Sequence, residues 1–193
     1  VWVERAASIG ELFDEALFDP KTGTLGEVFA SGWSVRNDDA GRVVEPGHHY
    51  EWVLLLSELT RLTGVDRSYQ ARHLLEFAEL NGVSKQGTIY ATVDRSGRVL
   101  NTDGRLWCYT ERLKAFLAQP HCSHHTSTAV QTTLTLLLER FCKPEGTWVD
   151  RLDKRLHAVP GPAPASSFYH LFLALSEYLR VTEGALALET RRL

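Results

Sequence analysis

Two neighbouring helical segments differ in how much of their surface is apolar, and this difference restricts the possible folds more than any other feature. Residues 48–62 have helical spacing, and their middle part, 52–56, is apolar on nearly every side, which is typical of a helix buried on several sides. Residues 67–81 carry one apolar stripe with polar residues elsewhere, as an outer helix does. The alternation predicts an all-α fold with an inner and an outer layer of helices rather than a four-helix bundle.

The other segments are consistent with this prediction. Helical spacing also marks residues 2–18, 105–118, 126–141 and 166–188. Residues 25–29 are a candidate for a short extended segment, and 88–93 with 98–100 predict a small β-hairpin. We therefore treat residues 1–193 as a single domain.

Composition and charge exclude several classes of protein. The 193 residues are 44% hydrophobic and 23% charged, an ordinary globular balance, and the net charge of −3 argues against nucleic-acid or anionic-membrane partners. No apolar run approaches the roughly 20 residues that span a bilayer. We expect a cytoplasmic protein whose Cys108, Cys122 and Cys142 are reduced thiols. The chain contains no methionine and opens within a helical pattern, so we expect a segment upstream of Val1.

The first candidate site lies where Pro46 and Gly47 precede a helix with His48 in its first turn. Glu51 follows three residues later on the same face. The partial positive charge of a helix N-terminus disfavours a protonated ring, and a neutral imidazole can act as a general base. Glu51 can orient that ring or accept a substrate hydroxyl. A His–Glu pair that only caps the helix fits the spacing equally well, and His49 should point away from His48.

The same arrangement recurs near the end of the chain. A Pro-rich loop is followed by Ser166 and Ser167, either of which can cap a helix, and by His170 in the first turn. Two histidines at the starts of two inner helices would face one cavity, which suits proton transfer between adjacent carbon atoms. Taken alone, His170 is equally well explained as a hydrogen-bonded core histidine.

Two further segments carry candidate side chains. Trp107 and Glu111 lie four residues apart on one helix face, and an indole beside a carboxylate suits a sugar ring; a core tryptophan with a surface glutamate is the alternative. The loop 146–153 could bring Trp148 to the same opening, but a packed loop is the preferred explanation of these residues taken alone. Residues 121–125 contain histidines and a cysteine but no second ligand cluster, so we expect no metal site there.

Four motifs in these segments carry a family resemblance. They are Glu-Pro-Gly-His-x-x-Glu-Trp at 45–52, Arg-x-Trp-x-x-Thr-Glu-Arg-Leu-Lys-Ala at 105–115, Gly-Thr-Trp-x-Asp-Arg-Leu-Asp at 146–153 and Pro-Ala-Ser-x-x-Tyr-His-Leu at 164–171. In this order they resemble the N-acylglucosamine 2-epimerase superfamily, in its mannose isomerase-like branch. Cys108 and Tyr109 depart from the Pro-Gln of many members. Family members are also much longer, so the chain is expected to be a C-terminal portion.

The resemblance implies an (α/α)6 barrel, here about half of one, with small β-hairpin insertions. It implies that His48 and His170 are the acid/base pair and that Glu51 supports His48. It also implies that no redox cofactor or metal is used. The residues expected to bind the substrate are Trp107, Glu111, Trp52, Trp148, Tyr169 and Arg105.

The implied reaction interconverts an aldose with its ketose or its C2 epimer, for sugars of the mannose, fructose and glucose type, through a cis-enediol(ate). One alternative is an N-acylglucosamine 2-epimerase. Others are a non-catalytic sugar-binding scaffold and an (α/α)6 glycoside hydrolase or lyase, which would need two acids such as Glu51 and Asp150. The expected partners are a monosaccharide and either the missing N-terminal half or a second copy of the chain.

Overall fold

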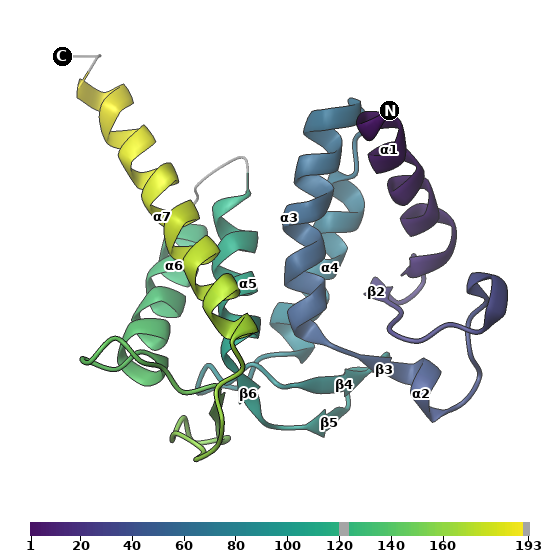
Figure 1. Ribbon diagram of the computed structural model, residues 1–193. Helices are drawn as coiled ribbons and strands as arrows, with labels where there is room; N and C mark the ends of the chain where they lie inside the picture. The colour runs from purple at the N-terminus through teal and green to yellow at the C-terminus, as the bar shows by residue number, and fades with distance from the viewer. Residues whose placement is uncertain (120–123, 191–193) are drawn as a thin grey trace.

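The computed structural model describes residues 1–119 and 124–190 and consists of helices with short strands gathered at one end (Figure 1). The α-helices are α1 (Trp2–Leu12), α2 (Asp39–Arg42), α3 (Pro46–Thr63), α4 (Ser68–Asn81), α5 (Leu106–Leu117), α6 (His124–Leu136) and α7 (Ser166–Thr190). Shorter helical turns are η1 (Phe13–Leu17), η2 (Ser31–Trp33) and η3 (Leu137–Phe141). The strands are β1 (Phe18–Asp19), β2 (Thr24–Leu25), β3 (Val43–Val44), β4 (Thr92–Asp94), β5 (Val99–Asn101), β6 (Gly104–Arg105) and β7 (Arg151–Leu152).

The long helices form the two predicted layers. Helix α3 packs against α4 and α5, and α5 packs in turn against α6 and α7, so that α3, α5 and α7 form an inner row backed by α4 and α6 (Figure 1). Helix α1 packs against α3. Nearly every residue of α5 is buried, because this helix has neighbours on both sides and behind it.

Proline and glycine fix the ends of α3 as their conformations require. Pro46 occupies the first helical turn, where its missing N–H is not needed, and Gly64 ends the helix with a left-handed φ of 73°. The predicted limits 48–62 are therefore nearly right. Burial of the helix is less complete than predicted, because Leu55 is 41% exposed and Leu62 is 45% exposed on a side that no described helix covers.

The strands connect segments that lie far apart in the sequence and that local sequence patterns do not link. The predicted hairpin exists as β4 and β5, but it begins four residues later than expected, because Ile89 instead forms a bridge with Val83. Strand β3 adds to its edge, with Val43 opposite Asp94. The sheet thereby ties the segment just before α3 to the segment before α5. None of the described helices is long and apolar enough to cross a membrane.

Candidate active site

The N-terminal ends of the inner helices α3, α5 and α7 meet at one cavity of about 340 Å³. Each helix follows a strand or a Pro-rich loop, and this brings its first turn to the same end of the molecule (Figure 1). Both predicted histidines face this cavity, although they are 122 positions apart in the sequence. Its lining residues are Glu45, His48, Glu51, Arg105, Trp107, Ser166, Ser167 and His170.

His48 is held by a carboxylate from a distant loop. Its Nδ1 lies 2.7 Å from Oε2 of Glu27, whose Oε1 accepts the backbone N–H of Glu45 at 2.9 Å. Burial by itself lowers the pKa of His48, but the hydrogen bond and charge of Glu27, with the charges of Glu45 and Glu51, raise it above the ordinary value of 6.5. Three carboxylates thus oppose the effect of the helix N-terminus, which was expected to favour the neutral ring. The orienting role expected of Glu51 belongs to Glu27.

His170 is held by a second carboxylate, this time from α5. Its Nδ1 lies 2.8 Å from Oε1 of Glu111, which is completely buried. The other oxygen of Glu111 accepts no hydrogen bond of ordinary geometry among the described residues, and the ammonium of Lys114 lies 2.8 Å from it. In both histidines Nδ1 is engaged by a carboxylate, so Nε2 remains for a substrate. Two such dyads facing one cavity can take a proton from one atom and return it to another.

Trp107 lies between the two histidines. Its ring centroid is 5.0 Å from that of His48 and 5.9 Å from that of His170. The position of the indole depends on Gly47, because a Cβ there would lie only 2.7 Å from Cζ3 of Trp107 and 2.8 Å from Sγ of Cys108. The glycine of the Pro-Gly-His motif thus allows α3 and α5 to approach closely enough for the ring to separate the two histidines.

Replacing Gly47 with alanine is expected to lower turnover by about 10²-fold, because the added methyl group must displace Trp107 and shift His48 out of reacting distance. The measurement is the rate of the reaction that the family resemblance implies, the interconversion of an aldose with its ketose or C2 epimer. Gly161→Ala is the matched control, because a Cβ at Gly161 meets no atom within 4 Å. A Gly47→Ala variant as active as the control would show that the close approach of α3 and α5 is unimportant.

Replacing Glu27 with glutamine is expected to lower the pKa of His48, because the amide keeps a hydrogen-bonding group but not the charge. A raised histidine pKa contributes stability that is present below about 6.5 and is lost as the pH rises through the folded-state pKa. The destabilisation by Glu27→Gln should therefore be larger at pH 6 than at pH 9 in urea unfolding. Glu58→Gln, at an exposed position of α3, should show no such difference. Equal destabilisation at both pH values would contradict this account.

Asp150 joins the starts of α5 and α7. It is 8% exposed, its carboxylate accepts the hydroxyl of Ser167 at 2.7 Å, and its backbone oxygen accepts the N–H of Leu106 at 2.9 Å. The hydroxyl of Ser167, one of the two serines predicted as possible caps of α7, is thus donated to Asp150. The loop 146–153 contributes to the site by fixing the helices that carry Trp107 and His170.

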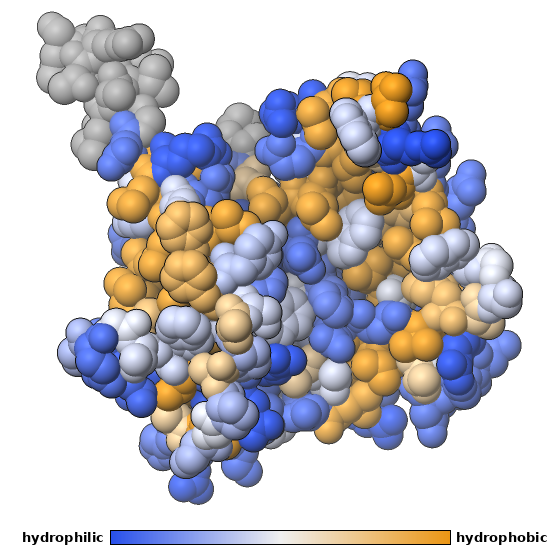
Figure 2. Space-filling model, viewed as in Figure 1, coloured by the Kyte–Doolittle hydropathy of each residue, from blue (hydrophilic) through white to orange (hydrophobic). Residues whose placement is uncertain are grey.

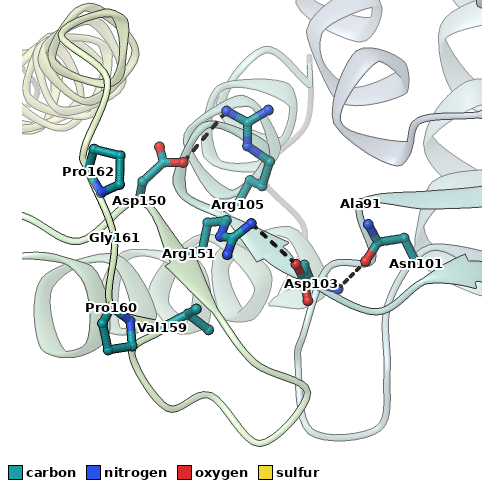
Figure 3. Close-up of a pocket in the computed structure, with 10 residues that line it drawn as sticks. All are labelled: Ala91, Asn101, Asp103, Arg105, Asp150, Arg151, Val159, Pro160, Gly161 and Pro162. Atoms are coloured by element: carbon teal, nitrogen blue, oxygen red, sulfur yellow. Dashed lines mark hydrogen bonds and ion pairs between the residues drawn. The ribbon is translucent and has the colours of Figure 1, made fainter.

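A second cavity, of about 380 Å³, adjoins the first and shares Arg105 with it (Figure 3). Nη2 of Arg105 lies 3.6 Å from Oδ2 of Asp150, and Nη1 of Arg151 lies 3.7 Å from Oδ2 of Asp103. The loop 159–162 forms the opposite wall. Because these charges cancel in pairs, the described lining of this cavity holds no uncompensated cation for a phosphate group.

The structure separates three predicted substrate-binding residues from the cavity. Trp52 stacks on Phe13 with ring centroids 4.5 Å apart, so it belongs to the packing between η1 and α3. Trp148 packs against Phe168 at 6.1 Å. Tyr169 is 59% exposed and does not line either cavity described above, although its ring lies edge-on to that of His170 with centroids 5.2 Å apart.

In the described part of the chain, few side chains are placed to bind a cation or to act as a nucleophile. One ligand atom each from Glu27, Glu45 and His48 lie within 4.8 Å of one another, but the Glu27–His48 hydrogen bond occupies the ring nitrogen that a cation would need. Residues 121–125, whose histidines and cysteine were considered as metal ligands and for which no metal site was expected, lie largely outside the described residues. Burial raises the pKa of the Cys108 thiol, so this thiol is not a nucleophile.

His49 confirms that adjacent histidines diverge. It is completely buried, its Nε2 accepts the N–H of Leu25 at 3.2 Å, and burial lowers its pKa to about 3.

Sequence reasoning missed Glu27 and Glu45 as groups that act on His48. Glu27 lies 21 positions upstream in a loop, and helical spacing offers no signal for a contact of that kind.

The sequence of this chain is similar to those of a known protein family and of a known relative. Residues 1–174 match the N-acylglucosamine 2-epimerase (GlcNAc 2-epimerase) family. The chain is 32% identical over 184 residues to a mannose-6-phosphate isomerase of Rhizobium meliloti (strain 1021), and the match covers 91% of this chain and 48% of that protein. The chain thus spans about half the length of this relative.

Solved structures show the same fold and the same partial coverage. The crystal structure of a D-mannose isomerase matches 83% of this chain and 47% of its own, with a TM-score of 0.71 and 19% identity. A cellobiose 2-epimerase from Bacillus thermoamylovorans B4167 matches 92% of this chain and 47% of its own, with a TM-score of 0.76 and 20% identity. The described helices therefore form about half of the (α/α)6 barrel that was predicted. The chain belongs to the N-acylglucosamine 2-epimerase family.

Proposed function

We propose that this chain carries the acid/base half of a sugar isomerase or 2-epimerase that acts on a monosaccharide of the mannose, fructose and glucose type. The observation that carries the proposal is the pair of histidine–carboxylate dyads, Glu27–His48 and Glu111–His170, on either side of Trp107. Each dyad leaves one ring nitrogen for the substrate. The face of the indole suits the C–H face of a sugar.

The chemistry begins with an open-chain aldose. His170 accepts the proton from C2 while His48, whose pKa is raised, donates a proton to the carbonyl oxygen, and the product is a cis-enediol. Return of a proton to C1, with loss of the proton from the C2 hydroxyl, gives the ketose. Return of a proton to C2 from the opposite face, with loss of the proton from the C1 hydroxyl, gives the epimer. Both outcomes need two proton-transfer groups that approach the same pair of carbons.

The glycoside hydrolase alternative is disfavoured by the environment of Asp150. A hydrolase needs two carboxyl groups that flank the scissile bond and exchange protons with substrate or water. Asp150 is buried and accepts the Ser167 hydroxyl, so it cannot serve as the partner of Glu51. The two histidines, each held by a carboxylate and facing the cavity, are the groups on which we base proton transfer.

An unphosphorylated sugar fits the site best. The relative named mannose-6-phosphate isomerase suggests a phosphosugar. However, Arg105 and Arg151 are each compensated by an aspartate. A phosphate there would meet two carboxylates as well as two guanidinium groups. N-acetylglucosamine is the alternative substrate, because the family takes its name from that reaction.

We also propose that further helices complete the ring. Apolar side chains gather over α7 and, across a more hydrophilic hollow, over α1 and α3 (Figure 2). Trp2 is 84% exposed and Phe172 is 57% exposed, and faces of this kind normally pack against another element. The occupant is the other half of the barrel, whether from the same polypeptide or from a second copy of the chain.

Product analysis tests the proposal. The protein, alone and with the remaining half of the barrel, is incubated with mannose, fructose, glucose and N-acetylglucosamine, and the products are identified by NMR. Interconversion of mannose with fructose or glucose supports the proposal, and epimerisation of N-acetylglucosamine alone supports the alternative substrate. A cello- or manno-oligosaccharide is included to test hydrolysis. Its cleavage, or binding of the four sugars without conversion in either form, would contradict the proposal.

A further inference from the structure

The two histidine dyads differ in what compensates their carboxylates. Glu111 is completely buried and has the ammonium of Lys114 2.8 Å from Oε2. Glu27 has no lysine or arginine nitrogen within 4 Å in the described ranges, and its second oxygen accepts a backbone N–H instead. One carboxylate is thus shared between a histidine and a permanent cation, whereas the other acts on its histidine alone.

Lys114 has no direct role in substrate binding. It lies one helical turn beyond Glu111 on α5, is 7% exposed and does not line the cavity. Burying an ammonium is unfavourable unless a carboxylate compensates it. A protonated His170 alone would neutralise Glu111, so the additional buried cation calls for a different explanation.

That explanation is electrostatic. If His170 is neutral, Glu111 and Lys114 form a pair with no net charge. If His170 is protonated, the same buried group carries two positive charges and one negative charge. The second state is less favourable in a site of low polarity. Lys114 therefore favours the form of His170 that can accept a proton.

We infer that Lys114 is a positioning residue for the reaction: it takes up the charge of the buried Glu111 and so leaves His170 to act as the proton acceptor of the pair. This inference rests on the proposed function. It also explains why two dyads of similar geometry have different roles in proton transfer. His48 lies among several carboxylates, whereas the carboxylate beside His170 is paired with the ammonium of Lys114.

Other charged groups share the cavity with His170, and a substitution of Lys114 removes none of them. Glu45, His48 and Glu51 come from the start of α3, and Arg105 comes from β6. Asp150 reaches α7 through Ser167. A change in the titration of His170 on substitution of Lys114 therefore reports the ammonium and its effect on Glu111.

The test is an NMR titration of the imidazole C–H signals, assigned with His170→Gln and His48→Gln variants. In Lys114→Met the titration midpoint of His170 should rise by about one pH unit, because an uncompensated carboxylate then acts on the ring. In Lys114→Arg it should stay close to that of the unchanged chain, and the His48 signal should hardly move in either variant. If Lys114→Met does not fold, Lys114→Gln is titrated in its place.

A midpoint of His170 that is unchanged or lower in the variant without the ammonium would overturn the inference. So would an equal shift of His48, because that would indicate a general structural effect. The titration needs no turnover, so it separates this inference from the proposed function, which is tested by product analysis of the unchanged protein. In the active protein, the acid limb of the kcat/KM profile should move to higher pH by the same amount in Lys114→Met and be restored in Lys114→Arg.

Discussion

The His170→Ala variant is expected to lose about 10³-fold of the rate of sugar conversion, because it removes the group that accepts the substrate proton. The fold should survive, since the ring is partly exposed at the cavity and its hydrogen bond is to Glu111, which keeps its ion pair with Lys114. His48→Ala should cause a loss of similar size by removing the proton donor. The measurement is kcat/KM, with unfolding by urea as the check on folding.

His157→Ala is the matched control for both histidine variants. Its side chain is 69% exposed and contacts Asp153 in a surface turn away from the cavity. It should retain normal activity. Near-normal rates in both His48→Ala and His170→Ala would show that the acid/base pair has been assigned wrongly, whatever reaction the protein performs.

The Arg112→Met variant should cause the largest loss of stability, about 3–5 kcal/mol of unfolding free energy, because it leaves a partly buried carboxylate without its cation. Arg112 donates from Nε and Nη2 to the two oxygens of Glu79, both at 2.7 Å, and also contacts Thr133. Tyr50 donates to the same carboxylate at 2.6 Å. The network therefore connects α3, α4, α5 and α6, and its loss affects both layers.

Urea unfolding measures this effect, and two variants make it specific. Arg72→Met removes an exposed arginine of α4 that only approaches the ring of Tyr69, and should change stability by less than about 0.5 kcal/mol. The double variant Arg112→Met with Glu79→Gln should recover part of the loss, because no unpaired carboxylate remains. A loss below about 1 kcal/mol in Arg112→Met would show that the network does not hold the two layers together.

The inner helices and their first-turn histidines could be predicted because their signals are local. Pro46 and Gly47 indicate the start of α3, and the Pro-rich loop before His170 indicates the start of α7. The repeated pattern of loop, turn and histidine was enough to place both rings at one cavity. Helix α6 and the turn that follows it also agree with the predicted limits 126–141 to within a few residues.

The remaining features depend on contacts between distant segments, which periodicity does not report. Glu27 reaches His48 from a loop, and β3 joins the edge of the β4–β5 hairpin. Trp52 lies in the same motif as His48, yet its direction on the helix turns it toward Phe13. The Glu111–Lys114 pair did have a local signal, an acid and a base three positions apart on one helix. Its burial came only from the packing of α5.

The most direct test of the central claim, that His48 and His170 move a proton between adjacent carbons of a sugar, is the position of deuterium after reaction in deuterated water. The account predicts deuterium at C1 of fructose or at C2 of the aldose formed from mannose, and loss of this label in His170→Ala. Conversion of mannose to glucose with no solvent deuterium at C2 would contradict the claim, since the second histidine would return a solvent-derived proton from the opposite face. So would unchanged labelling in both histidine variants.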